Sequence, residues 1–210
     1  MSSVQYFKEV ASEWDQMADS FFGESPRKTI YQNANWSQIK TVADLGCGAG
    51  YLTEGLADRD VKVTAIDQSQ EMLDIMKSKL GEDRIDYLKG DGGSIPLEDN
   101  SIDLAIANMF LHHVDHPPQT IKEAYRIVKP GGQWIFTDLD EHANEFLVTE
   151  QHDKWMGFKR EDITKWMTEA GFINVEIDCV GADCCASSSS NDSEAKVSIF
   201  MAKGEKPNNI

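Results

Sequence analysis

The chain has 210 residues, of which 40% are hydrophobic, and this length and composition fit one domain with a sizeable core. Asp and Glu number 36 against 20 Lys and Arg, and the net charge of −16 disfavours nucleic acid and acidic lipid surfaces as partners. No stretch resembles a membrane span or a secretory signal, so we expect a cytoplasmic protein with reduced cysteines.

The first 40 residues are expected to form a helical cap ahead of the main domain, which we place at residues 41–210. Residues 2–35 have the pattern of two helices, the second beginning with Ser25 as its cap and Pro26 in its first turn. Such a segment can cover the mouth of a site on the following domain.

From residue 41 onward, short runs rich in β-branched residues alternate with stretches of helical period, which is typical of a parallel α/β sheet. Seven strands are expected, at residues 41–45, 61–66, 84–88, 102–107, 133–138, 173–180 and 196–202. The last two are joined by a polar loop, 181–195, with no room for a crossover helix, so they should pair antiparallel. The predicted fold is an α/β, Rossmann-like, mostly parallel seven-stranded sheet with an antiparallel C-terminal hairpin and helices on both faces.

Caps and apolar stripes mark the helices between these strands. Ser69 can cap a helix that ends at Gly81, and a second helix carries its stripe over residues 121–128. A third carries apolar residues over 163–170 and is closed by Gly171.

The strongest functional signal is the sequence Asp44-Leu45-Gly46-Cys47-Gly48-Ala49-Gly50 at the end of the first strand. Glycines at this turn let a ligand approach the backbone. Asp67, followed by Gln68, ends the second strand, where a carboxylate can accept hydrogen bonds from ribose hydroxyls. The pattern therefore predicts a nucleoside-type site.

The loop disfavours a nicotinamide dehydrogenase. It reads Gly-Cys-Gly-Ala-Gly instead of the GxGxxG of dinucleotide enzymes, and it follows Asp44. A carboxylate at this turn would repel a pyrophosphate but suits an ammonium group.

These motifs resemble those of class I S-adenosylmethionine-dependent methyltransferases, from about residue 41 to 202. The resemblance implies that the glycine loop contacts the methionine moiety through its backbone and that Asp67 binds the ribose. Gly90-Asp91-Gly92 resembles the segment that holds the adenine edge, and Asn108 resembles the position facing the methionine end. The implied cofactor residues are Asp44, Gly46, Gly48, Gly50, Asp67, Gln68, Asp91, Gly92 and Asn108.

The implied activity is methyl transfer to a small-molecule acceptor, with S-adenosylmethionine as cofactor and no metal. His112, His113, Asp138 and His142 lie near carboxyl ends of strands, where ligands of such sheets bind. We favour His113 as a catalytic base and consider His142 a substrate contact. Packing or local hydrogen bonding of the histidine pair is the alternative.

Cys179, Cys184 and Cys185 form the one unusual chemical cluster, near the final loop. Thiolates bind soft metals and metalloids, and methyltransferases that act on trivalent arsenic hold their substrate with cysteines. The alternatives are therefore a methyltransferase acting on a metalloid such as arsenite, thiols without a role, or a non-catalytic regulatory protein that binds S-adenosylmethionine. The sequence does not determine the oligomeric state.

Overall fold

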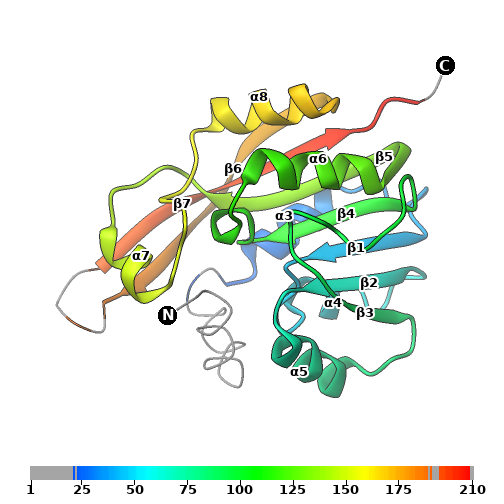
Figure 1. Cartoon of the computed structure of the whole chain (residues 1–210), viewed down its shortest axis with the longest axis horizontal. Helices are drawn as coiled ribbons and strands as arrows, with labels where there is room; N and C mark the ends of the chain where they lie inside the picture. Colours follow the sequence, from blue (N-terminus) through cyan, green and yellow to red (C-terminus); the bar gives the residue numbers. More distant parts are fainter. Residues whose placement is uncertain (1–20, 22, 189, 191–193, 209–210) are drawn as a thin grey trace.

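The computed structural model describes residues 21, 23–188, 190 and 194–208, which build an α/β structure around one sheet (Figure 1). The sheet has seven strands in the order β3-β2-β1-β4-β5-β7-β6. Neighbours from β3 to β5 are parallel, and β7 is antiparallel to both β5 and β6. The predicted mostly parallel sheet with an antiparallel C-terminal hairpin is therefore confirmed. The strands are β1 (Thr41–Leu45), β2 (Lys62–Asp67), β3 (Ile85–Lys89), β4 (Ile102–Asn108), β5 (Val128–Leu139), β6 (Ile173–Ser187) and β7 (Glu194–Glu205).

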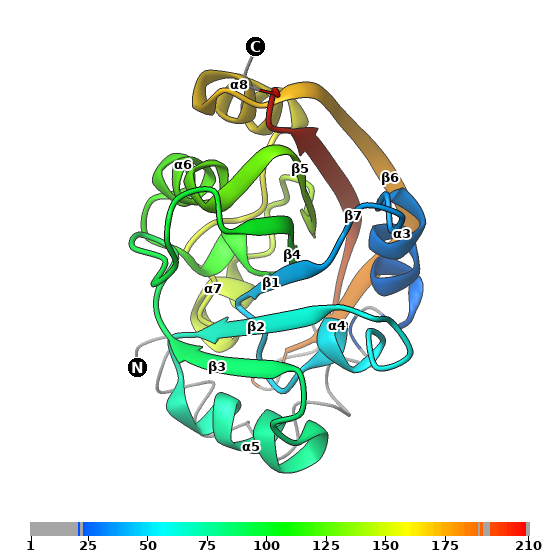
Figure 2. The ribbon, with the colours of Figure 1, turned by 90° about the vertical axis from the view of Figure 1, so that its right-hand side faces the viewer.

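Helices cover both faces of the sheet, as Figure 2 shows, which confirms the prediction. The helices are α3 (Ser25–Asn33), α4 (Tyr51–Glu54), α5 (Gln70–Leu80), α6 (Pro117–Ile127), α7 (Glu145–Glu150) and α8 (Arg160–Ala170), with a 3-10 turn η1 (Leu111–His113). Side chains alternate between the faces of β5. Trp134 and Phe136 pack in one buried cluster with Ile121 of α6, whereas Ile135 between them packs in another with Ile30 of α3.

The predicted start and end of α5 and the predicted end of α8 agree with the structure. The Ser69 hydroxyl accepts a hydrogen bond from the N–H of Met72 at 3.3 Å, and Gly81 follows the last residue of α5. Gly171 ends α8 with a φ of 111°, a conformation that favours glycine.

The start of α3 differs from the prediction. Lys28 N–H donates to the carbonyl of Glu24 at 3.1 Å, so helical hydrogen bonding begins one residue early and Glu24, not Ser25, is the capping residue. Ile30 is fully buried against the sheet, so α3 covers a sheet face instead of the mouth of the site. The first helix of the predicted cap falls mainly in residues 1–20, which lie outside the described residues.

The C-terminal hairpin is longer than predicted, and the expected loop 181–195 is mostly strand. Residues 183–187 pair with residues 194–198 in antiparallel register after a register shift that follows Cys179. The lengthened hairpin extends beyond the parallel strands, and α7 packs beside it (Figure 1). β5 also begins early, at Val128, because Pro130-Gly131-Gly132 lies within a register shift of that strand instead of in a separate turn.

None of the helices among the described residues is both long and apolar enough to cross a membrane.

Candidate functional site

A cavity of about 260 Å³ opens at the carboxyl ends of β1, β2 and β4. Most of the sequence-predicted cofactor residues line it, and His113 lines the same space. These residues are Asp44, Gly46, Gly48, Asp67, Gln68, Asp91, Gly92 and Asn108. Gly50 is not among the lining residues, and neither are His142 and the three C-terminal cysteines.

The glycine loop is built from left-handed turns, because Gly46, Gly48 and Gly50 have φ values of 66°, 52° and 98°. A Cβ at Gly46 would clash with the ring of Phe110. A Cβ at Gly50 would lie 3.0 Å from Met76, so this glycine allows close packing on α5.

Four backbone N–H groups of the loop, those of Gly46, Cys47, Gly48 and Gly50, already have protein acceptors. The carbonyl of Ile66 accepts from Gly46 and Cys47 at 2.8 and 3.1 Å, and Gly50 donates to Cys47. Gly48 donates to Asp67 Oδ2 at 3.0 Å. A pyrophosphate needs free N–H donors, and α4 after the loop is only four residues long, so the loop is unsuited to a dinucleotide.

Two buried or half-buried carboxylates lie beside the loop. Asp44 accepts a hydrogen bond from the Thr53 hydroxyl at 2.7 Å, and burial, reinforced by the charge of Asp67, raises its pKa to about 7. Asp67 accepts from Ser69 N–H at 2.8 Å with its second oxygen, and burial raises its pKa as well. This end of the cavity therefore favours a cationic or hydroxyl-bearing ligand.

Asp91, Gly92 and Asn108 lie on the adjoining wall. Asp91 is exposed, and its Oδ1 accepts from the N–H groups of Gly93 and Ser94 at 2.8 and 3.1 Å, which fixes the turn after β3. Asn108 Oδ1 accepts from the Thr137 hydroxyl at 2.7 Å, so the orientation of its amide is set by β5.

The histidine pair sits on η1, between the cavity and a buried acid. His112 Nδ1 lies 2.7 Å from Asp138 Oδ1, and the N–H groups of Leu111 and Leu139 also donate to the Asp138 carboxylate at 2.8 Å. Burial alone would lower the pKa of His112. The negative charges of Asp138 and Asp153 have the larger combined effect and raise the pKa of His112 to about 9. Burial and the charge of His112 hold the pKa of His113 well below its usual value, so His113 is neutral at pH 7.

The segment after α7 contributes residues that sequence reasoning missed. Asp153 is buried beside both histidines, and Lys154 lines the cavity. The N–H groups of Lys154 and Trp155 donate to the carbonyl of His112 at 3.0 and 3.2 Å, which attaches this segment to η1. No periodicity or motif in the sequence marks these residues, because the contact joins segments far apart in the chain.

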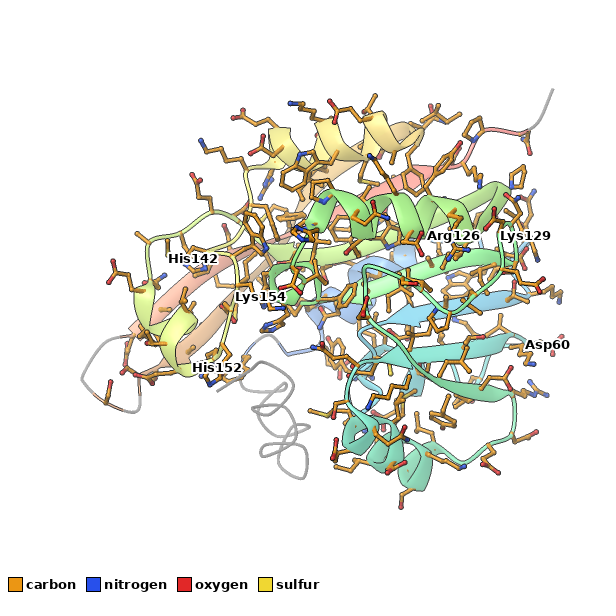
Figure 3. All side chains as sticks on the ribbon, viewed as in Figure 1. Asp60, Arg126, Lys129, His142, His152 and Lys154 are labelled. Atoms are coloured by element: carbon orange, nitrogen blue, oxygen red, sulfur yellow. The ribbon has the colours of Figure 1, made fainter. Side chains whose placement is uncertain are left out.

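His142 lies in the segment leading to α7 and is not among the residues that line the cavity. Figure 3 shows it on the same side of the molecule as His152 and Lys154, opposite Asp60 and Lys129. Its Nδ1 accepts from Asn144 N–H at 3.2 Å. Its position as a substrate contact therefore stays a prediction.

The cysteines do not form a cluster around one point. Cys184 is buried beside Leu139 and Leu147, whereas Cys185, the next residue on β6, is exposed. Adjacent residues of a strand point to opposite faces, so these two thiols cannot chelate one ion together. The expected loop at residues 181–195 is wrong for Cys184 and Cys185, because both are paired with β7 in the hairpin. A substrate role of the three cysteines stays a prediction.

Comparisons with known proteins agree with this geometry. Residues 43–136 match a family described as a methyltransferase domain. The ubiquinone biosynthesis O-methyltransferase of Coxiella burnetii is 26% identical over 153 residues, which cover 66% of this chain and 65% of that protein. The malonyl-(acyl-carrier protein) O-methyltransferase of Pectobacterium atrosepticum is 37% identical over 98 residues, or 47% of this chain and 38% of that protein.

The chain thus spans less than two-thirds of the length of these relatives. Among solved structures, the (4+2)-cyclase SpnF has the same fold, with a TM-score of 0.76, 17% identity, and coverage of 100% of this chain and 98% of that one. The sheet order, the glycine loop and the matched segment 43–136 together support a methyltransferase domain of the class I S-adenosylmethionine-dependent family.

Proposed function

We propose that this chain is an enzyme that transfers the methyl group of S-adenosylmethionine to a small-molecule acceptor. The observation that carries the proposal is the shared cavity. Asp44 and Asp67 line one part of it, and the neutral His113 lines another. A cationic methyl donor and an acceptor therefore have complementary groups within a single space.

The cavity residues fit S-adenosylmethionine, which supplies a methyl group on a positively charged sulfur. The Asp44 carboxylate balances the ammonium of the methionine moiety. Asp67, held by Gly48 and Ser69, keeps lone pairs for the ribose hydroxyls. Asp91 and the amide of Gly92 face the adenine, while Gln68 and Asn108 complete the walls.

Gly50 does not line the cavity, so its contribution to the cofactor site is indirect. Its left-handed conformation and its packing against Met76 give the loop its shape, so it positions the lining glycines without touching the ligand.

The two histidines differ in their ability to accept a proton from the methyl acceptor. His112 is fixed and charged between two carboxylates, so it is unsuited to accept a proton at pH 7. His113 is neutral and lines the cavity, so it accepts the proton of the acceptor. Its low basicity suits an acceptor whose hydroxyl ionises readily but still carries its proton at pH 7, such as a phenol. The two relatives above are both O-methyltransferases, which supports an oxygen acceptor.

The test combines binding with turnover, since a cyclase shares this fold and binding alone does not prove transfer. Calorimetry should detect S-adenosylmethionine and S-adenosylhomocysteine but not NAD. Incubation with methyl-labelled S-adenosylmethionine and a metabolite extract should then give a labelled product in mass spectrometry. Binding without any labelled product would favour a regulatory protein, and absence of binding would refute the proposal.

A further inference from the structure

Three potential ligand side chains from two distant segments converge beside the cavity. His112 and His113 lie on η1, and Asp153 follows α7. Their ligand atoms all lie within 4.8 Å of one another. Asp153 Oδ1 is 3.7 Å from His112 Nε2 and 3.8 Å from His113 Nδ1. Two ligand atoms bound to one ion at about 2.1 Å each lie at most about 4.2 Å apart, so both distances fit a shared ion.

We infer that His112, His113 and Asp153 form a site for a divalent transition-metal ion in the wall of the cavity. Two imidazoles and one carboxylate are a ligand set of Fe²⁺, Zn²⁺ and related ions, and three protein ligands leave coordination positions open. The sequence alone indicated no metal, because Asp153 is far from the histidine pair in the chain.

Outer hydrogen bonds support this assignment. A histidine that binds a metal usually donates its other ring N–H to a carboxylate or a backbone carbonyl. His112 Nδ1 contacts Asp138 Oδ1 at 2.7 Å, which leaves Nε2 directed toward Asp153, and an ion bound at Nε2 would displace the proton that this nitrogen carries in the metal-free protein. His113 has a hydrogen bond with the backbone of His152. Both rings are therefore held in place by a second partner.

The local charge also favours a cation. Asp138 and Asp153 are 0% and 6% exposed, so two carboxylates are buried within reach of one imidazole. Burial of carboxylates without compensating charge is costly. An ion bound to Asp153 and both imidazoles would compensate the second carboxylate.

The location links the ion to the acceptor. His113 and Lys154 line the cavity, so the open positions of the ion would face that space. A hydroxyl or carboxylate acceptor could occupy one of them, and a metal ion lowers the pKa of a bound hydroxyl. With the ion present, His113 is a ligand and the ion replaces it in activating the acceptor. This consequence rests on the proposed function, whereas binding of the ion does not.

The test measures ion binding without any methyl donor. The full chain carrying Cys179→Ser and Cys185→Ser, which remove the exposed thiols, is stripped with EDTA and titrated with Co²⁺ and Zn²⁺. Visible absorption should report one Co²⁺ per chain, and calorimetry should give the same stoichiometry for Zn²⁺. Asp153→Asn should weaken binding at least 100-fold, and Asp138→Asn about 10- to 100-fold.

The matched control is Asp178→Asn, an exposed carboxylate of β6, which should bind as the parent does. If Asp153→Asn fails to fold by circular dichroism, His113→Gln replaces it with the same expected loss. Absence of stoichiometric binding, or unchanged affinity in the folded variant, would overturn the inference. Calorimetry of the EDTA-treated protein with S-adenosylhomocysteine tests the proposed function independently of the metal site. The two tests are separate because the cofactor-binding residues are distinct from His112, His113 and Asp153.

Discussion

Asp67 Oδ2 accepts a hydrogen bond from the N–H of Gly48 at 3.0 Å, so the acid that ends β2 is tied directly to the glycine loop after β1. Asp67→Ala should therefore have two effects. It removes a hydrogen-bond acceptor for the ribose, and it removes the hydrogen bond that holds the glycine loop at Gly48. We expect affinity for S-adenosylhomocysteine to fall by about 1 to 3 kcal/mol, measured by calorimetry. Unchanged affinity would exclude Asp67 from the cofactor site.

Gly48 has a φ of 52° and lines the cavity, so a side chain there should cost both binding and stability. Gly48→Val should abolish cofactor binding, and the strained backbone should lower the stability of the fold by about 1 to 2 kcal/mol. The structure provides a control in Gly81, which has a φ of 74° and no atom within 4 Å of an added Cβ. Gly81→Ala should lower the melting temperature without changing cofactor affinity. Retained binding in Gly48→Val would mean that the loop has only a structural role.

The raised pKa of Asp44 predicts opposite effects of pH on affinity and on stability. Its pKa in the folded protein is about 7, so raising the pH from 6 to 8 ionises it and should strengthen binding of the cationic S-adenosylmethionine by about tenfold. Calorimetry across this range tests the effect, and Asp44→Asn should flatten the profile. An equally steep profile in the variant would assign the dependence to another group.

Stability should change in the other direction. The folded state holds the Asp44 proton up to about pH 7, whereas an unfolded chain releases it near pH 4, so the folded state binds more protons in this window. The contribution of Asp44 to stability is full below about pH 4 and declines as the pH rises to 7. Denaturant unfolding of the wild type and Asp44→Asn at pH 5 and 8 should show a smaller decline in the variant.

The two adjacent cysteines of β6 should respond differently to the same substitution. Cys184 is buried among Leu139, Leu147 and Val197, so Cys184→Ser buries a hydroxyl in an apolar cluster and should cost about 1 to 3 kcal/mol of stability. Cys185 is exposed, and Cys185→Ser should leave the stability unchanged. We expect no arsenite-dependent turnover of S-adenosylmethionine. Such turnover, lost in the Cys184 and Cys185 double variant, would restore a substrate role for these thiols.

The parallel part of the fold was predictable because its signals are local. The glycine loop, the acid at the end of β2 and the Ser69 cap each depend on a few consecutive residues. The errors arose where distant segments decide the structure. The residues 181–195 look like a polar loop, yet their pairing with the last strand extends the sheet, and Asp153 reaches the histidine pair only through tertiary packing.

The same distinction applies to the histidines. Both were visible in the sequence, but their different environments were not. Asp138 contacts His112, whereas His113 faces the cavity, so burial and charge separate their pKa values in opposite directions. The sequence could therefore name the pair but not derive which member stays neutral.

His113 provides the sharpest test of acceptor activation. In protein stripped of metal by EDTA, His113→Gln removes the neutral base that lines the cavity, and kcat/KM for the acceptor should fall by about 10²- to 10⁴-fold. Affinity for S-adenosylhomocysteine should not change, because Asp44 and Asp67 remain. The loss should shrink as the pH rises through the pKa of the acceptor, since an acceptor that is already ionised needs no base. The measurement is a pH profile of label transfer for both proteins, with the acceptor found by the labelling experiment. A constant loss at every pH would mean that His113 positions the acceptor instead of taking its proton, and an unchanged rate would remove it from the reaction.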